Sequence, residues 1–148
     1  MDLILWRHAE AEDGFPDLAR RLTAKGHKQA EKMGAWLKER LPGDTLVLCS
    51  PAERCRQTAS ALTKEFTTLN ELAPGANHEI LLHAVQWPKR AGAVVLVNHQ
   101  PTLGELAAYL LCGEVRGWNV KKGAIWWLRR RDHESQAFLK AALSPEML

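Results

Sequence analysis

Short apolar runs alternate along the chain with longer segments in which apolar residues recur every three or four positions. Continuous apolar runs are typical of strands buried on both faces of a sheet, whereas the longer spacing is typical of helices with one buried face. The runs predict strands at 3–7, 45–49, 67–72, 93–97, 124–129 and 136–142. The second pattern predicts helices at 24–41, after Ser50, from Asn77 through Trp87 and after Thr102.

Polar residues stand where these helices should begin. Thr23 and Asn77 precede two of them, and such side chains accept hydrogen bonds from the free amides of a first helical turn. The segments 50–53 and 102–105 have the Ser/Thr-x-x-Glu spacing of a capping box. Four helix starts are therefore predicted from local sequence.

Strands that alternate with helices predict an α/β fold, a three-layer sandwich with a mostly parallel sheet and helices on both faces. The short connection between the last two strands predicts an antiparallel C-terminal hairpin. The chain has 148 residues and shows no repeat or linker, so we expect a single domain over residues 1–148.

Composition narrows the class of protein. The three cysteines form neither a disulfide framework nor a C-x-x-C pair, which indicates reduced thiols and a cytoplasmic location. No apolar stretch of about 20 residues and no leader pattern is present, so neither a membrane span nor export is expected. The net charge of +3 is mild, and the basic segment "LRRRDHE" is interpreted as a solvated hairpin turn rather than a nucleic-acid site. Nothing in the sequence demands more than a monomer.

Basic side chains follow three of the predicted strands. Arg7 and His8 end the first, Arg54 follows the second by a few residues, and His99 follows the strand at 93–97. Because ligands bind beyond the carboxyl ends of parallel strands, we expect these four residues to converge, with two helix amino ends beside them. Two guanidinium groups and two imidazoles favour a compact dianion such as phosphate.

This set of residues carries a definite chemistry, although each member alone is common in structural or solvated positions. A neutral imidazole can attack phosphorus, and arginines can stabilise the transition-state charge in place of a metal ion. No metal-ligand spacing is present, so no metal and no cofactor are predicted.

The same residues resemble the motifs of the histidine phosphatase superfamily, which has the phosphoglycerate mutase-like fold. Its opening Arg-His-Gly stands here as Arg7-His8-Ala9, its Ser-Pro and Arg-x-x-Gln-Thr-Ala block as "SPAERCRQTA" at 50–59, and its later histidine as "NHQP" at 98–101. The resemblance spans most of the chain. The chain is as short as the SixA-type phosphohistidine phosphatases, and its segment "RRLTAKGHKQAEKMGAWL" resembles that branch of the family.

This resemblance implies that His8 is the nucleophile and becomes phosphorylated, while Arg7, Arg54 and His99 bind the phosphoryl group. A hydrogen bond from the other ring nitrogen of His8 to a backbone carbonyl is expected to set its tautomer. The implied substrate is a phosphorylated signalling protein, such as a histidine phosphotransfer domain or a phosphocarrier. Two alternatives stay open: a phosphomonoesterase for a small metabolite or sugar phosphate, and a non-catalytic phosphate-binding module.

Three further positions lie near the motifs. Glu71 falls where the mutases carry their general acid, and the alternative interpretation is a surface glutamate. Because an imidazole leaving group needs little acid, Glu71 would matter more for phosphoester substrates. Arg20 is a candidate phosphate ligand or a solvated loop charge. Ala9 replaces the family's glycine, which is tolerated if the backbone there has negative φ.

Overall fold

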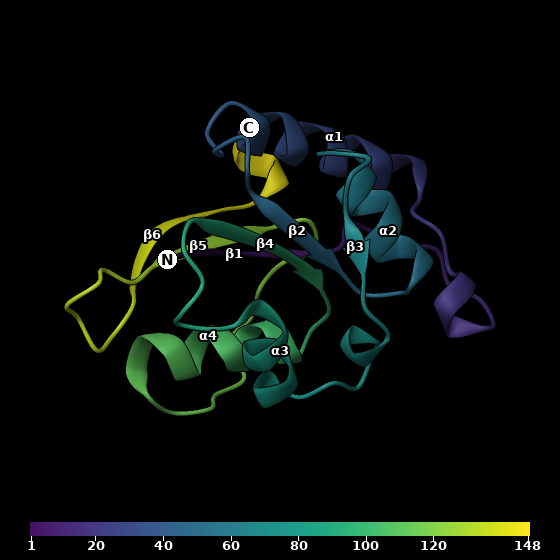
Figure 1. The fold of residues 1–148 in the computed structure, drawn as a ribbon. Helices are drawn as coiled ribbons and strands as arrows, with labels where there is room; N and C mark the ends of the chain where they lie inside the picture. The colour runs from purple at the N-terminus through teal and green to yellow at the C-terminus, as the bar shows by residue number, and fades with distance from the viewer.

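The computed structural model describes residues 1–148 as one six-stranded sheet with helices on both faces (Figure 1). The strands are β1 (Asp2–Arg7), β2 (Leu46–Cys49), β3 (Thr67–Thr68), β4 (Ala93–Asn98), β5 (Ile125–Arg129) and β6 (Phe138–Leu143). Their order in the sheet is β3-β2-β4-β1-β5-β6, and the first four strands in this order run parallel. Strand β5 pairs antiparallel with β1, and β6 pairs antiparallel with β5. The predicted α/β sandwich and C-terminal hairpin are confirmed.

Four α-helices cover the sheet. Helices α1 (Ala24–Lys38) and α2 (Glu53–Ser60) lie on one face, and α3 (His78–Val85) and α4 (Thr102–Cys112) lie on the other (Figure 1). Three short 3-10 helices, η1 (Asp17–Ala19), η2 (Asn70–Leu72) and η3 (Pro145–Met147), complete the structure. None of the helices is both long and apolar enough to cross a membrane.

The apolar run of β1 is explained by burial on both faces of the sheet. Leu3 and Leu5 join the core under α3 and α4, whereas Ile4 and Trp6 join the core under α1 and α2. All four side chains are fully buried, and each such burial stabilises the fold by about 1.5–3 kcal/mol relative to exposure. Successive residues of a strand point to opposite faces, so a central strand must be apolar throughout.

Two of the predicted caps are present. The Thr23 side chain accepts a hydrogen bond from Gly26 N, and the Asn77 side chain accepts one from Ile80 N. Helix α1 ends at Lys38 rather than at residue 41, and α3 ends at Val85 rather than at residue 87. Local side chains thus define where these helices begin better than where they end.

Two other local predictions are wrong. The strand expected at 67–72 pairs with β2 only at Thr67–Thr68, after which η2 turns Leu72 into the core. At α4 the capping side chain is Gln100, which accepts a hydrogen bond from Gly104 N at 2.7 Å, whereas the Thr102 hydroxyl donates to Ala76 O. This amide of the first turn of α4 is therefore not free to bind an anion.

The capping box predicted at 50–53 is also only partly formed. The Ser50 hydroxyl accepts a hydrogen bond from Ala52 N, but the helix itself begins at Glu53. Ser50 therefore stabilises the turn that leads from β2 into α2 rather than capping the helix directly.

Candidate active site

The carboxyl ends of β1, β2 and β4 lie side by side in the sheet. Arg7 pairs with Asn98, and Cys49 pairs with Val97, so the residues that follow these strands emerge at one edge. They line a cavity of about 230 Å³ together with residues from three loops: Arg7, His8, Ala11, Arg20, Arg54, Pro74, His99, Gln100 and Lys122. The structure thus brings together the four principal residues singled out in the sequence, and Arg20 with them.

His8 is held in one tautomer. Its Nδ1 lies 2.8 Å from the carbonyl oxygen of Ala9, and since a carbonyl only accepts, Nδ1 carries the proton. Burial lowers the pKa of His8 to about 4, and the nearby charges of Arg54 and Arg7 act in the same direction. The ring is therefore neutral at pH 7, and the lone pair of Nε2 is available, as the expected tautomer requires.

The loop after His8 is tied to α2. Ala9 N donates to Thr58 Oγ1 at 3.1 Å, and the Thr58 hydroxyl donates to Arg54 O at 2.8 Å. Ala9 is fully buried and does not have positive φ, so alanine replaces the family's glycine without backbone strain. One threonine thereby links the positions of His8 and Arg54.

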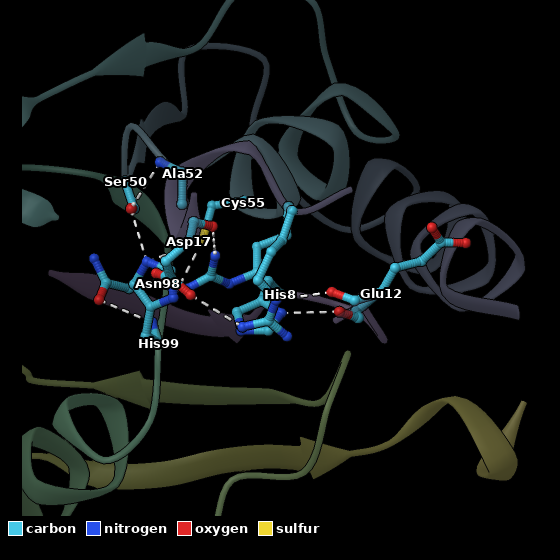
Figure 2. Close-up of polar contacts among 11 residues, drawn as sticks. His8, Glu12, Asp17, Ser50, Ala52, Cys55, Asn98 and His99 are labelled. Carbon is cyan, nitrogen blue, oxygen red and sulfur yellow. Dashed lines mark hydrogen bonds and ion pairs between the residues drawn. The ribbon is translucent and has the colours of Figure 1, made fainter. Parts of the chain in front are cut away.

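His99 is fixed through its backbone and its ring. Its N–H donates to Asn98 Oδ1 at 2.8 Å, while Asn98 Nδ2 donates to Leu72 O. Its Nε2 shares a hydrogen bond with Ser50 Oγ at 2.7 Å (Figure 2). Burial, followed by repulsion from the protonated form of His8, lowers the pKa of His99 to about 3. The two imidazoles are neighbours, with ring centroids 5.2 Å apart and ring planes tilted by 60°.

The two motif arginines lie against the cavity with spare hydrogen-bonding capacity. Arg7 Nη1 donates to Val120 O at 2.8 Å, and burial lowers the pKa of Arg7, which still leaves it charged at neutral pH. The Nε–H groups of Arg7 and Arg54 are buried without a hydrogen-bond partner. Both side chains line the cavity, where guanidinium groups are suited to bind an oxygen-rich anion.

Asp17, which sequence reasoning missed, joins two of the cavity's arginines. Its carboxylate lies 3.1 Å from Arg54 Nη2 and 3.1 Å from Arg20 Nη1, and its carbonyl accepts from Arg54 Nη1 at 2.8 Å (Figure 2). Arg20 Nε donates to Glu12 O at 2.7 Å, so Arg20 is a fixed part of the rim rather than a loose loop charge. The hydrogen bond from Arg20, followed by that from Arg54, lowers the pKa of Asp17. The spacing of Asp17 and Arg20 permits an ion pair, but nothing local indicates the contact with Arg54.

Glu71 lies apart from this cavity. It is exposed on η2 and borders a separate surface depression with Asn77, Glu79, Ile80 and His83. Pro74, three residues further along, is the part of this loop that reaches the cavity. The role of Glu71 as a general acid stays a prediction.

Other reactive groups do not add to the chemistry of the site. Cys49 and Cys55 are buried, and burial raises the pKa of the Cys49 thiol to about 12 and that of Cys55 well above its usual range. Neither thiol is therefore ionised at neutral pH, as a cysteine nucleophile would need to be. No group of three or more His, Cys, Asp or Glu side chains is arranged to hold a metal ion.

Known proteins are similar to this chain in sequence and in fold. The sequence profile of the histidine phosphatase superfamily (branch 1) matches residues 3–77. The chain is 32% identical over 128 residues to the phosphohistidine phosphatase SixA homolog of Haemophilus influenzae, an alignment that covers 74% of this chain and 77% of the relative. It is 30% identical over 123 residues to phosphohistidine phosphatase SixA of Escherichia coli K12, covering 77% and 76%.

The fold agrees with these sequence matches. A solved structure of the protein histidine phosphatase SixA complexed with tungstate has a TM-score of 0.85 and 26% identity to this chain, over 99% of both chains. The chain belongs to the histidine phosphatase superfamily, in its SixA branch.

Proposed function

We propose that this histidine phosphatase removes the phosphoryl group from a phosphohistidine side chain of a protein, through a covalent intermediate on His8. One observation carries the proposal: His8 is neutral, its Nδ1–H is bound to Ala9 O, and its Nε2 is left free at a cavity lined by three arginines. The tungstate bound to the SixA structure is a tetrahedral oxyanion like phosphate, which supports a phosphoryl site in this cavity.

The proposed reaction has two displacement steps. In the first, the Nε2 lone pair of His8 forms a bond to phosphorus while the bond from phosphorus to the substrate's imidazole breaks. That imidazole leaves with the electron pair and takes up a proton from solvent. In the second, water attacks the phosphorus of phospho-His8, and the phosphorus–Nε2 bond breaks. Phosphate leaves and His8 returns to its neutral form.

The arginines and His99 stabilise both transition states. Arg7, Arg54 and Arg20 bind the phosphoryl oxygens, where negative charge is spread in the transition state, and His99 hydrogen-bonds one of them. These cations fill the role that a metal ion has in other phosphoryl-transfer sites, so we expect turnover to survive treatment with EDTA.

The leaving group favours a phosphoramidate over a phosphoester substrate. An alkoxide is strongly basic and needs a proton donor, whereas imidazole, with a conjugate-acid pKa of about 6.5, leaves readily. The residues that line the cavity include no carboxylic acid, and Glu71 lies outside it. This favours the phosphohistidine substrate over a small phosphomonoester.

The test is to trap the intermediate. The protein is mixed briefly with a phosphocarrier protein labelled on its phosphohistidine, quenched in alkali, and mapped by mass spectrometry. We expect label on His8 that decays with time, in wild type and in His27→Ala, an exposed histidine, but none in His8→Ala. Full turnover by His8→Ala would overturn the proposal.

Glu71→Gln discriminates the substrate class. We expect its kcat on the phosphohistidine protein to stay within about twofold of wild type, because an imidazole leaving group needs little acid. Where a general acid is needed, it typically contributes about 10²–10⁴-fold to the rate. A loss of that size on phosphohistidine, or activity on phosphomonoesters alone, would favour the phosphoesterase alternative.

A further inference from the structure

Three lysines of α1 line an open groove on the surface of the protein. Lys25, Lys28 and Lys32 are spaced three and four residues apart, which places them on one face of the helix, and all three are exposed. The groove has a volume of about 460 Å³ and is completed by Gln29 of the same helix and by Pro145 and Glu146 of η3.

The positive charge of this groove is only partly matched within the molecule. Lys25 and Lys28 form no ion pair, and Lys32 Nζ donates to a main-chain oxygen of Leu148, the last residue of the sequence, at 3.3 Å. The acidic residue of the groove, Glu146, is paired with Lys121 at 3.2 Å. Like charges at these spacings destabilise a helix, so the lysines do not serve the fold of α1.

The groove adjoins the catalytic cavity. Gln29 lines the groove. Its side-chain oxygen accepts a hydrogen bond at 3.0 Å from the backbone N–H of Glu10, two residues after His8. Lys122 lines the catalytic cavity, and the next residue, Gly123, packs against Pro145 and Gln29, which line the groove. A Cβ at Gly123 would lie 2.9 Å from Pro145 Cγ and 3.5 Å from Gln29 Cβ.

We propose that this groove, with Lys25, Lys28 and Lys32 along it and Lys122 at its cavity end, docks an acidic surface segment of the phosphoprotein substrate. The proposal rests on the proposed function and names the chemistry that selects the substrate protein. A phosphohistidine held in the cavity places neighbouring parts of its own protein over the groove, where acidic side chains meet exposed ammonium groups. A free small phosphate compound occupies the cavity alone and leaves the groove empty.

The test compares two triple variants that remove the same charge. One is Lys25→Gln, Lys28→Gln and Lys32→Gln; the control is Lys38→Gln, Lys64→Gln and Lys89→Gln, three exposed lysines outside the groove and without ion pairs. Each is assayed on a phosphohistidine-bearing phosphotransfer protein and on free phosphohistidine, at about 20 mM and about 300 mM salt.

We expect the groove variant to lose about tenfold or more in kcat/KM on the phosphoprotein at low salt, through KM, with kcat unchanged. The loss shrinks at high salt, because exposed charges are screened. Activity on free phosphohistidine, and the control variant on both substrates, stay within about twofold of wild type.

Three outcomes would overturn the proposal. Equal kcat/KM of both variants on the phosphoprotein would remove the groove from substrate binding while the proposed function stands. An equal loss on free phosphohistidine would assign the lysines to the cavity's own field. A groove variant that loses binding to RNA or to vesicles of anionic lipid, but not activity on the phosphoprotein, would assign another partner. Failure of the wild type on every phosphohistidine substrate would overturn the proposed function itself.

Discussion

At the scale of single residues, two arginines of the candidate site are paired with a carboxylate that is not part of the cavity lining. Asp17 forms ion pairs with Arg54 and Arg20, two of the proposed phosphoryl ligands. Its side chain is 54% exposed, so both ion pairs lie partly in solvent and are worth little in stability. Asp17 therefore orients the two guanidinium groups and, as an anion, would compete with a phosphoryl group for them.

Asp17→Asn separates these two effects, because asparagine still accepts a hydrogen bond but carries no charge. We expect competitive inhibition by inorganic phosphate to tighten about two- to fivefold, as the loss of an opposing exposed charge predicts. The inhibition constant is measured beside Asp13→Asn, an exposed aspartate in the same loop without an ion pair. Weaker inhibition of Asp17→Asn by phosphate would show that its charge helps phosphate binding instead.

At the scale of elements, the first turn of α1 packs directly on the loop that follows His8. A Cβ at Gly26 would lie 2.0 Å from Glu10 O, the same oxygen that accepts a hydrogen bond from Thr23 N. Only glycine allows this contact between helix and loop. The position of His8, the proposed nucleophile, therefore depends on a residue that does not line the cavity.

Gly26→Ala is expected to lower the free energy of unfolding by about 1–3 kcal/mol, the usual cost of an overpacked contact, and to reduce kcat as the His8 loop is displaced. Gly43→Ala is the matched control, since a Cβ there meets nothing within 4 Å and its φ is not positive. Urea unfolding and kcat are compared for both variants. Equal behaviour of the two would mean that the loop yields without strain.

At the scale of the whole molecule, the buried site makes stability depend on pH. His8 and His99 have folded-state pKa values of about 4 and about 3, against 6.5 in the unfolded chain. Between these values the unfolded chain binds more protons than the folded one, so acidification favours unfolding. Protonation of these two histidines is thus coupled to the free energy of unfolding of the whole protein.

We expect the free energy of unfolding to fall as the pH drops from 6.5 toward 4, by at most about 1.4 kcal/mol per pH unit for each histidine. Urea unfolding at pH 7, 6 and 5 measures the slope. It should become shallower in His8→Asn and stay unchanged in His27→Ala, whose side chain is exposed. A slope that is the same in all three proteins would place the titrating groups elsewhere.

Features that arise from neighbouring residues follow directly from the amino-acid sequence. The apolar run of β1 requires burial on both faces, and the Thr23 and Asn77 side chains reach amides only three residues away. The residues at the ends of parallel strands had to meet at one edge, so His8 and His99 could be placed together. Both inferences rest on strand period and helix geometry, which hold wherever the elements form.

Features that depend on the path of the chain between helices and strands are set by long-range contacts of the folded protein. Asp17 meets Arg54 across 37 residues of sequence because the loop carrying η1 folds back over α2. Glu71 falls outside the cavity because the predicted strand breaks into η2, and the lysines of α1 adjoin the site because Gly123 and Pro145 pack on Gln29. Loop paths follow from the sum of many weak long-range contacts, and no spacing within a short segment encodes that sum.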